Sequence, residues 1–384
     1  MPNKVCVIVQ NPYWRDTRVR RETRALRSHG YKVSVIAVRD SNEAKYEIVN
    51  DIKVYRGGFQ KKRSGLVRYL LEYVMFFLFA TFKLNALDLR EKFDVVHINT
   101  LPDFLVFAAI IQKLKGRKIV LDMHEIAPEF FMSKFGVSIR HPVVRLLLFL
   151  EKISLRFADE VITVNDPIKS IFQKRAIPNK SITVVMNTMD GTAAKPRGRL
   201  PHEGFNCVHH GTLTDLYGVD IAIQGFSKAL KHFNDIFFHI YGDGPHLPYL
   251  KRLTEELDLQ DHVIFHNQIP YDKMINALAD MDLGLLPNRK DVFLDLSFSN
   301  RLAEYVYSKI PVISSDLDTV KYYFTNKEIL YFEAGNVDDL SEQIAFAYTN
   351  RAKLQEMAES AYERAKAYNW AIMEQRYLEV VEGH

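Results

Sequence analysis

The sequence predicts an α/β protein made of two doubly wound parallel sheets, and three observations lead to that prediction. Short apolar runs alternate with helix-like segments along nearly the whole chain of 384 residues. The runs are continuously apolar, as the strands of a parallel sheet are when helices cover both of its faces. A polar segment rich in Gly and Pro, residues 188–204, separates two such series, and a chain of this length favours two or three domains.

The first series of elements occupies residues 1–187. Its expected strands are Lys4–Gln10, Lys32–Val38, Val95–Ile98, Lys118–Met123, Glu160–Val164 and Ile182–Met186. The helix-like segments between them are Thr17–His29, Val67–Leu87, Asp103–Lys115 and Phe135–Arg156, the last broken at Pro142. This βαβα rhythm builds a parallel sheet with helices packed against it.

The second series repeats the rhythm without repeating the sequence. Its expected strands are Asn206–His209, Ile236–Tyr241, Val263–His266, Leu283–Leu286, Val312–Ser314 and Leu330–Phe332. Its expected helices are Val219–His232, His246–Leu257, Tyr271–Ala279, Asn300–Ser308, Val337–Thr349, Ala352–Tyr368 and Trp370–Val381. We therefore expect domains at 1–187 and 205–368, a linker at 188–204, and a C-terminal helix within 369–384.

The composition is that of an ordinary globular protein, with 47% apolar and 26% charged residues. The longest apolar run, Tyr73–Phe82, is much shorter than the about 20 residues of a spanning helix, so we expect no integral membrane protein. The first residues, MPNKVCVIVQN, lack the pattern of a signal peptide. The two cysteines, Cys6 and Cys207, stand in apolar runs and indicate core thiols in a reducing compartment. These features favour a cytoplasmic location.

The net charge of +4 hides an asymmetry between the two halves. Residues 1–190 carry 32 Lys and Arg against 19 Asp and Glu, a net charge of +13. Residues 191–384 carry 19 against 28, a net charge of −9. The first half is therefore expected to face an anionic partner, for which a phosphorylated substrate, a phospholipid surface and nucleic acid are the alternatives.

Basic side chains crowd the start of the first expected helix. Asp16 is a suitable N-cap, and Arg15, Arg18, Arg20 and Arg21 surround it. Cations are unfavourable at a helix N-terminus, whereas its free N–H groups favour an anion, so a bound phosphate would resolve the conflict. The alternative is a solvated basic helix face.

A second cluster follows the strand Lys118–Met123. His124, Glu125 and Glu129 stand where ligands bind in open parallel sheets, beyond the carboxyl ends of the strands. A His beside carboxylates suits proton transfer or the binding of sugar hydroxyl groups. A purely structural His is the alternative.

In the second half, two glycine-containing turns follow strands. Gly211 and Gly218 lie between a strand and a helix, where glycine permits a phosphate to approach the backbone. Gly242 begins a similar turn, Gly-Asp-Gly-Pro, after the next strand. The spacing matches neither the dinucleotide-binding fingerprint nor the P-loop, so each turn alone is a weak signal.

The helix expected at Asn300 carries Arg301 and Glu304 on one side. A helix N-terminus with an Arg can bind a diphosphate, and a carboxylate one turn later can accept hydrogen bonds from ribose hydroxyl groups. A surface ion pair is the alternative. The acidic pairs Asp280/Asp282 and Asp316/Asp318 are interpreted as structural, and no metal ion or other cofactor is expected.

Taken together, the segments of this chain resemble glycosyltransferase family 4, whose members are retaining enzymes of the GT-B architecture with two Rossmann-like domains facing across a cleft. The resemblance covers nearly the whole chain and points to enzymes of bacterial cell-surface polysaccharides. It is carried by DTRVRRETRALRSHGYKVSVI, FDVVHINTLPD, VLDMHEIAPEFF, RFADEVITVN, VVMNTMD, HHGTLTDLYGVDIAI, IYGDGPHLPYLKRL, VIFHNQIP and SNRLAEYVYSKIPVISSD, whose order and spacing are specific.

The resemblance implies a nucleotide-sugar donor, with a UDP-sugar favoured, bound mainly by the second domain. Glu304 would bind the donor ribose, and Asn300 and Arg301 its diphosphate. The phosphates and the sugar would lie against Gly211, Thr212, Leu213, Tyr217 and Gly242. The base would be bordered by the segment Asn267–Pro270, in which Asn267 and Ile269 are the named donor residues. The C-terminal helix would cross back to the first domain.

The acceptor, lipid-linked or a polysaccharide, would be bound by the first domain. The implied acceptor residues are Arg15, Arg18, Arg21 and Glu129, and the implied catalytic residues are His124, Glu125 and Asp295. Many family members carry two Glu eight residues apart, whereas Leu296 occupies the first of these places here, and we expect Asp295 to substitute. Thr212 and Tyr217 replace a customary Arg and Lys, so Arg289 or Lys290 is expected to help Arg301 to neutralise the diphosphate.

Three functional hypotheses follow. The first is a transferase at the inner face of an anionic membrane, favoured by the apolar segment Val67–Leu87 and the basic residues Lys61, Lys62, Arg63 and Arg68 beside it. The second is a non-catalytic protein that binds a nucleotide sugar or organises an assembly, favoured by the replacements at 212, 217 and 296. The third, nucleic-acid binding, lacks a stacking platform and is not expected.

Overall fold

The structure, a computed structural model, describes residues 4–41, 43–57, 66–188 and 202–383. The chain forms two compact units. The first unit contains Met1–Asn187 together with Ala371–His384, and the second contains Thr188–Trp370. The predicted linker, 188–204, lies almost entirely outside the described residues.

The first unit is built on an eight-stranded sheet in the order β3-β4-β2-β1-β5-β6-β7-β8. The strands are β1 (Lys4–Pro12), β2 (Lys32–Val38), β3 (Tyr46–Val49), β4 (Ile52–Gly57), β5 (Val95–Asn99), β6 (Lys118–Met123), β7 (Glu160–Thr163) and β8 (Ile182–Val184). All neighbours pair in parallel except β3 and β4, which are antiparallel. The sheet is thus mixed at one edge, where the sequence analysis expected only parallel strands.

The antiparallel edge is a hairpin that the sequence analysis did not predict. Two residues, Asn50 and Asp51, join β3 to β4, and both have positive φ, 49° and 61°. Two successive residues in this region form the turn that matches the twist of a hairpin. Residues 46–49 are largely exposed, so they lack the apolar run that marked the other strands.

The helices of the first unit are the 3₁₀ helix η1 (Tyr13–Arg15), α1 (Thr17–Ser28), α2 (Leu66–Glu91), the 3₁₀ helix η2 (Asp103–Ala109), α3 (Ile110–Leu114), α4 (Ala127–Phe135), α5 (Pro142–Phe157), α6 (Asp166–Arg175) and α14 (Trp370–Glu382). Two expectations need correction. The predicted helix at 103–115 is a 3₁₀ helix followed by a short α-helix. The predicted helix at 135–156 begins only at Pro142, because α4 ends at Gly136, which adopts the left-handed conformation.

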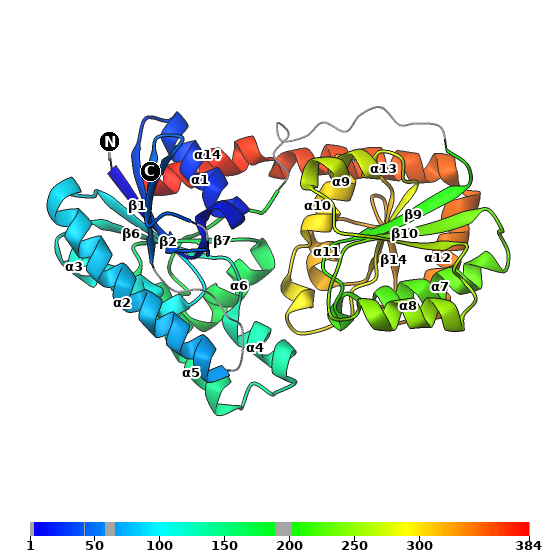
Figure 1. Ribbon diagram of the computed structural model, residues 1–384, viewed down its shortest axis with the longest axis horizontal. Coiled ribbons are helices and arrows are strands. Elements are labelled where there is room, and N and C mark those ends of the chain that lie inside the picture. Colours follow the sequence, from blue (N-terminus) through cyan, green and yellow to red (C-terminus); the bar gives the residue numbers. More distant parts are fainter. Residues whose placement is uncertain (1–3, 42, 58–65, 189–201, 384) are drawn as a thin grey trace. The chain divides into compact units, whose positions relative to one another are not determined.

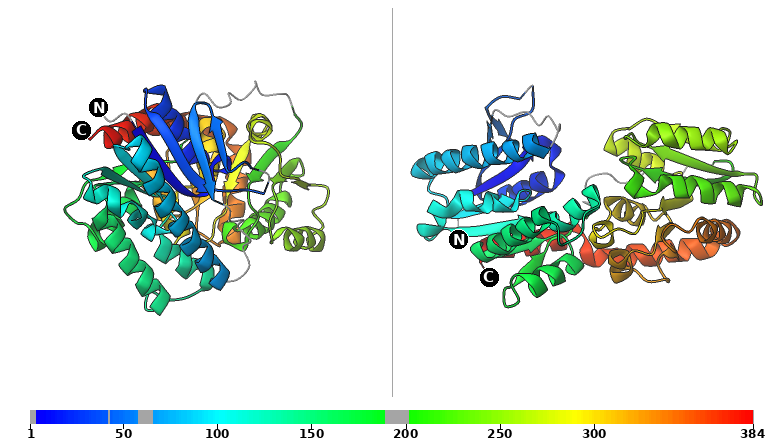
Figure 2. Two further views of the ribbon diagram at one scale, coloured as in Figure 1. Left: turned by 60° about the vertical axis from the view of Figure 1, so that its left-hand side comes forward. Right: turned by 90° about the horizontal axis from the view of Figure 1, so that it is seen from below.

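The direction of the crossovers decides which face each helix covers (Figures 1 and 2). Connections between parallel strands are right-handed. The step from β1 to β2 runs one way along the sheet, whereas the steps from β4 to β5, β6, β7 and β8 run the other way. Therefore α1 lies on one face, and α2, η2, α3, α4, α5 and α6 lie on the opposite face.

The C-terminal helix α14 packs within the first unit. The hydroxyl group of Tyr377 lies 3.0 Å from Nδ1 of His97, and the hydroxyl group of Tyr31 donates to Glu382 at 3.0 Å. The side chains of Met373 and Tyr377 are fully buried. The last helix is thus part of the core of the first unit.

The second unit contains a six-stranded parallel sheet in the order β11-β10-β9-β12-β13-β14. Its strands are β9 (Phe205–His210), β10 (Ile236–Tyr241), β11 (Val263–His266), β12 (Leu283–Leu286), β13 (Val312–Ser315) and β14 (Leu330–Phe332). The parallel pairing agrees with the prediction. The direction of the crossovers reverses between β9 and β12, and such a switch point is where open sheets bind ligands.

The helices of the second unit are η3 (Asp215–Tyr217), α7 (Val219–Leu230), α8 (Leu247–Glu256), α9 (Tyr271–Leu278), η4 (Leu294–Leu296), α10 (Asn300–Tyr307), α11 (Asp318–Tyr323), α12 (Val337–Thr349), α13 (Arg351–Ala365) and η5 (Lys366–Tyr368). The sequence analysis did not predict α11, which is only six residues long. The core lies between the sheet and these helices, and Phe205, Phe226 and Phe238 are among its largest buried side chains.

Candidate active site

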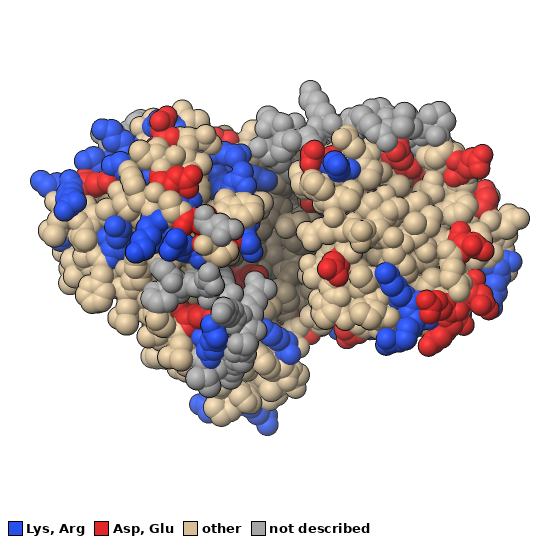
Figure 3. All heavy atoms as spheres, in the orientation of Figure 1, with Lys and Arg blue, Asp and Glu red and all other residues tan. Residues whose placement is uncertain are grey.

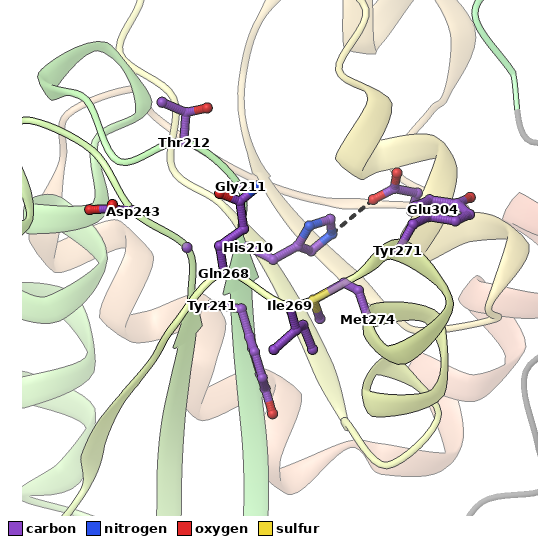
Figure 4. Close-up of a pocket in the computed structure, with 11 residues that line it drawn as sticks. His210, Gly211, Thr212, Tyr241, Asp243, Gln268, Ile269, Tyr271, Met274 and Glu304 are labelled. Carbon is purple, nitrogen blue, oxygen red and sulfur yellow. Dashed lines mark ion pairs between the residues drawn. The ribbon is translucent and has the colours of Figure 1, made fainter. Parts of the chain in front are cut away.

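A pocket of about 290 Å³ opens in the second unit, at the carboxyl ends of β9, β10 and β11. Helices α9 and α10 complete its wall (Figure 4). The lining residues are His210, Gly211, Thr212, Tyr241, Gly242, Asp243, Gln268, Ile269, Tyr271, Met274 and Glu304. The pocket therefore adjoins the switch point of the sheet, as expected for a parallel α/β domain.

Two glycines allow the turns at the pocket to touch each other. Gly211 and Gly242 have φ values of 117° and 147°, which favour glycine. A Cβ atom on Gly242 would lie 1.9 Å from the carbonyl oxygen of Gly211. The turns after β9 and β10 thus form one compact, backbone-lined wall of the pocket.

Arg301, at the start of α10, is buried behind this wall. A Cβ atom on Gly211 would lie 3.6 Å from the side chain of Arg301, so the backbone at Gly211 covers the guanidinium group closely. Nη1 of Arg301 donates to Nε2 of His209 at 2.9 Å and to the carbonyl oxygen of His210 at 3.4 Å. The guanidinium group also lies 4.0 Å from the centre of the Tyr217 ring. All these partners are electrically neutral.

The neutral state of His209 has a structural cause. Nδ1 of His209 lies 3.0 Å from the carbonyl oxygen of Leu285, and a carbonyl group can only accept, so Nδ1 carries the proton. Nε2 is then free to accept from Arg301. Burial, together with the nearby Arg301, holds the pKa of His209 well below its usual value. Arg301 is therefore buried without a counter-charge, because no carboxylate oxygen of the described residues lies within 4.0 Å of it.

Glu304 lies one turn further along α10 and faces the pocket. Its Oε2 atom lies 3.1 Å from Nε2 of His210, and the two side chains point toward one another (Figure 4). Burial raises the pKa of Glu304 to about 7, even though Arg301 opposes this shift. Burial and Arg301 lower the pKa of His210 to about 3, so His210 is neutral at physiological pH. Near pH 7, Glu304 therefore exists both as the acid and as the carboxylate.

Most residues that the resemblance linked to a donor lie at this pocket. Gly211, Thr212, Gly242, Ile269 and Glu304 line it, and Arg301 lies behind it in contact with Tyr217. Asn300 is exposed at the first position of α10, and Asn267 precedes the lining residue Gln268.

Two expected donor residues are engaged elsewhere. Leu213 has a fully buried side chain in the core, its N–H donates to the carbonyl oxygen of Asp243, and its own carbonyl oxygen accepts from His246. The guanidinium group of Arg289 donates to Asp215 at 3.0 Å and to Asp220 at 2.6 Å. The structure thus accounts for both residues by contacts within the protein.

The expectation that Asp295 replaces a catalytic Glu stays a prediction, although the structure gives its carboxylate a partner within the protein. Asp295 does not line the pocket. Its Oδ1 atom accepts from the N–H of Asp318 at 2.8 Å, and its carbonyl oxygen accepts from the hydroxyl group of Thr319. The carboxylate therefore caps the first turn of α11, a helix that the sequence did not reveal.

Several lining residues were missed by the sequence analysis, namely Tyr241, Asp243, Tyr271 and Met274. Tyr241 stacks on His266 with ring centres 4.0 Å apart and planes 7° apart. His209 and His210 were quoted within a motif but received no role. A signal was available, because the ends of β9 and β10 were predicted well. His209, His210 and Tyr241 stand at these strand ends, next to Gly211 and Gly242.

In the first unit, His124 follows β6 and is held by neighbouring strands. Its Nε2 atom lies 3.0 Å from Oδ1 of Asn99 and 3.0 Å from Oδ2 of Asp122. The amide orientation of Asn99 follows from its Nδ2 atom, which donates to the carbonyl oxygen of Ile8. Because Nε2 faces two oxygen acceptors, it carries the proton, and Nδ1 is the nitrogen available to a hydroxyl group of a substrate.

Arg18 was expected at an anion site, but the structure places it in a buried network. Its guanidinium group binds Asp122 through two nitrogen atoms, at 2.7 and 3.0 Å, and lies 3.2 Å from Glu22. Although burial disfavours ionisation, Arg18 and His124 hold the pKa of Asp122 well below its usual range. Burial raises the pKa of Glu22 well above its usual value. The carboxylate of Asp122 thus neutralises Arg18, and no external phosphate is needed for this.

The other expected acceptor residues differ in their exposure. Arg15 is exposed and pairs with Asp40, and Arg21 is half-buried on α1. Glu129 is buried and binds Arg175 at 2.6 Å, so it forms an internal ion pair. Glu125 is half-buried beside His124, and burial raises the pKa of its carboxyl group.

Within the part of the chain that the structure describes, two side-chain groups bring potential metal ligands within 4.8 Å of one another, Glu22-His97-Asp122 and Asp215-Asp220-His246. In each group an arginine already binds a carboxylate, Arg18 in the first and Arg289 in the second. These guanidinium groups supply the positive charge that a metal ion would supply.

Comparisons with known proteins assign both halves of the chain. A family model described as "Glycosyltransferase Family 4" matches residues 16–191, and one described as "Glycosyl transferases group 1" matches residues 192–364. The phosphatidylinositol N-acetylglucosaminyltransferase GPI3 subunit of Saccharomyces cerevisiae is 22% identical over 343 residues, which cover 85% of this chain and 73% of the yeast protein.

Solved structures share the fold. Sucrose-phosphate synthase from Thermosynechococcus elongatus superimposes with a TM-score of 0.81 at 14% identity, covering 99% of this chain and 98% of that chain. The HepE protein of Anabaena, crystallised in complex with UDP, gives a TM-score of 0.68 at 14% identity, covering both chains fully, 100% of each. With two parallel-sheet units, and with family models that match consecutive halves of the sequence, the chain belongs to glycosyltransferase family 4 and has the GT-B architecture.

Proposed function

We propose that this glycosyltransferase moves a sugar from a nucleotide sugar, with a UDP-sugar favoured, to a lipid-linked or polysaccharide acceptor, and that the anomeric configuration is retained. The proposal places the enzyme in the cytoplasm and requires neither a metal ion nor another cofactor. The observation that carries it is the buried Arg301, which lacks a carboxylate partner among the described residues and lies behind the pocket.

A buried charge without a counter-charge is unfavourable unless a ligand supplies one. The diphosphate of a nucleotide sugar would supply it. The first turn of α10 adds free backbone N–H groups, which favour the same anion. Glu304, one turn away, offers carboxylate oxygens that can accept hydrogen bonds from the ribose. A nucleoside diphosphate therefore matches both the positive charge at the start of this short helix and the carboxylate of Glu304 one turn later.

The comparisons support the proposed substrates. The Anabaena structure contains UDP, and the name of the yeast relative describes the transfer of N-acetylglucosamine to phosphatidylinositol. These properties belong to those proteins. They favour a UDP-sugar and a lipid acceptor here over a phosphorylated soluble acceptor or nucleic acid.

The residues of the chain suggest how the transfer would proceed. Departure of the nucleoside diphosphate leaves negative charge on its phosphate oxygens, and the fixed positive charge of Arg301 would stabilise that charge. The acceptor hydroxyl group would attack from the same face, with its proton passing to the departing phosphate. Nδ1 of His124 would bind a hydroxyl group of the transferred sugar or of the acceptor.

Calorimetric titration with UDP, GDP, ADP and their common sugar conjugates tests the donor site. We expect saturable binding of one nucleotide series, weakened about tenfold to a hundredfold in Arg301→Ala, since a hydrogen bond to a charged group contributes about 1.5–3 kcal/mol. Glu304→Ala should also weaken binding. Glu256→Ala, an exposed position on α8, is the matched control. Equal affinities in all of these proteins would contradict the assignment.

One observation favours a non-catalytic protein as the second candidate. Leu296 stands where many family members carry a Glu, and the carboxylate of the neighbouring Asp295 already accepts a hydrogen bond from the backbone of α11. A protein of this kind would bind a nucleotide sugar without turning it over. Release of the nucleoside diphosphate from the bound donor, in the presence of lipid extracts as acceptor, distinguishes the two candidates.

A further inference from the structure

Helix α2 exposes an apolar stripe along its length. The exposed positions recur every three or four residues, as on one face of a helix, and they are Leu70, Leu71, Val74, Met75, Leu78, Phe82 and Leu89. Phe82 is 73% exposed and Leu89 is 76% exposed. Single exposed apolar side chains are ordinary, whereas a continuous row of them marks an interaction site.

The stripe continues onto the neighbouring helices of the same layer. The 3₁₀ helix η2 contacts α2 through Phe104 and Phe77, and it contacts α5 through Phe107 and Phe157. Beside these contacts, the exposed apolar side chains are Ile110, Ile111 and Leu114 on α3, Leu146 and Phe149 on α5, and Phe135 and Ile139 at and after the end of α4. We call this set, with the α2 stripe, the α2–α5 face.

The acidic and the basic residues of this helix layer differ in their exposure to solvent. Its acidic side chains are buried or partly buried, and most are paired within the protein: Glu72 with Arg68, Asp88 with Lys115, Glu91 with Lys53, Glu129 and Glu151 with Arg175, while Asp103 is buried. Basic residues are exposed instead, among them Arg68, Arg90, Lys115, Lys134, Arg140, Arg145 and Arg156. Figure 3 shows Lys and Arg as the more frequent charged side chains on the drawn surface of the first unit. The α2–α5 face is thus apolar and rimmed by positive charge.

Helix α2 has the composition of a membrane-spanning helix, but it is packed against the sheet of the first unit. Contrary to the expectation from its longest uninterrupted run, the segment Leu70–Glu91 is long and apolar enough to cross a membrane, and 22% of its most apolar window is buried. The same helix connects β4 to β5, and Phe76, Ala80 and Leu84 are packed in the core of the first unit. A helix held in this way can lie along a bilayer surface.

We propose that the α2–α5 face docks the protein on a lipid bilayer that contains anionic lipids. The apolar side chains would enter the boundary between headgroups and acyl chains, and the exposed Arg and Lys side chains would bind lipid phosphates. This occupant is chosen because the face combines exposed apolar side chains with exposed basic side chains, while its acidic side chains are buried or partly buried. The residues Lys61, Lys62 and Arg63, which the sequence hypothesis also invoked, lie outside the described residues and do not enter this argument.

Flotation of the full chain with phosphatidylcholine vesicles, with and without phosphatidylglycerol, tests the proposal. We expect binding to the anionic vesicles that weakens as salt is raised. The double variant Arg140→Glu/Arg145→Glu should weaken binding at least about tenfold, since each basic residue near such a surface contributes about 1 kcal/mol. Leu78→Ser/Phe82→Ser should weaken binding even at low salt, because it removes the inserted side chains.

Controls come from exposed positions of the second unit. Lys251→Glu/Arg252→Glu and Phe346→Ser should bind vesicles like the unaltered protein. No binding to anionic vesicles, or equal binding by all variants, would overturn the proposal. So would self-association, measured by light scattering and abolished by Leu78→Ser/Phe82→Ser, because the face would then cover a second copy of the chain. Nucleotide affinity should be unchanged in every variant, so this test is independent of the donor site.

Discussion

Two buried arginines, Arg18 and Arg301, differ in the charge of the groups that they contact. Arg18 is matched by the carboxylate of Asp122, so its charge is neutralised within the first unit. Among the described residues, the contacts of Arg301 are with neutral groups, namely His209, a carbonyl oxygen and the Tyr217 ring. The same residue type therefore stabilises the fold in one unit and is available to an anion in the other.

The ionisation of Glu304 makes a prediction about pH. Since burial raises its pKa to about 7, the affinity for a UDP-sugar that matches the site should increase as pH rises through about 7, because the carboxylate accepts two hydrogen bonds more readily than the acid. A sugar conjugate is used because its diphosphate does not titrate in this range. In Glu304→Gln, calorimetry should give an affinity that is nearly independent of pH between 6 and 8, within about twofold.

The raised pKa of Glu304 also predicts that the stability of the fold falls as pH rises, whereas the affinity for the donor increases. A carboxyl group whose pKa is raised by folding stabilises the folded state below its ordinary pKa, and this contribution is lost as pH rises toward 7. Glu304→Gln should therefore gain in free energy of unfolding, relative to the unaltered protein, as pH is raised from 5 to 8. A gain that is constant across this range would contradict the shifted pKa.

His124 predicts a separation of binding from turnover. His124→Ala should leave nucleotide affinity unchanged but lower turnover by about a hundredfold or more, as expected for a group that binds a reacting hydroxyl. Asn99→Ala, which removes one acceptor from Nε2, should lower turnover less. The readouts are calorimetry for affinity and release of nucleoside diphosphate for turnover. A matched fall in affinity and turnover would assign His124 to the donor site instead.

At the scale of elements, the pocket depends on the contact between two turns. The turns after β9 and β10 meet at Gly211 and Gly242, and the wall that they form lies in front of Arg301. The sequence marked both turns by their glycines. It did not indicate that they touch, because strand order in a sheet is set by tertiary packing.

Gly242→Ala tests this contact. The added Cβ atom would lie 1.9 Å from the carbonyl oxygen of Gly211, at a φ of 147°, so the turns must separate. We expect a loss in the free energy of unfolding of about 2–4 kcal/mol and weaker nucleotide binding. Gly30→Ala is the control, because its φ is also positive, 85°, while nothing lies within 4 Å of the added atom. It should lose only about 1 kcal/mol and bind normally.

Strands and helices could be predicted where the segment itself carries a sequence signal. All six strands of the second sheet were predicted, because each is a short apolar run between helices. The hairpin β3–β4 and the helices α4, α6 and α11 were missed. The hairpin lies at an exposed edge, and α11 is capped by Asp295, which is 23 residues earlier in the chain. Such a capping contact leaves no mark in the segment itself.

At the scale of the whole molecule, the two halves of the chain carry opposite net charges, and the last helix belongs to the first unit. Helix α14 reaches β5 across 280 positions of sequence, through the hydrogen bond between Tyr377 and His97. We therefore expect the stability of the first unit to depend on α14.

Tyr377 provides a graded test of this dependence. Tyr377→Ala leaves a cavity and should cost the first unit about 3–5 kcal/mol, whereas Tyr377→Phe removes only the hydrogen bond and should cost about 1 kcal/mol. Thermal unfolding with and without a nucleotide distinguishes the units. The transition that the nucleotide raises should keep its midpoint in Tyr377→Ala. If that transition falls as well, α14 also stabilises the second unit.

The fold class, the strands of the second sheet, the family and about half of the residues that line the pocket were predictable from the sequence, because apolar runs and glycine turns are local signals. The matching of the charges depends on tertiary packing. This packing placed Arg18 against Asp122, Arg289 against Asp215 and Asp220, and Asp295 at the start of α11, while Arg301 was left with neutral partners. The reason is physical: an ionisable side chain is defined by its burial and by partners that are distant in sequence, and neither is visible until the sheet is assembled.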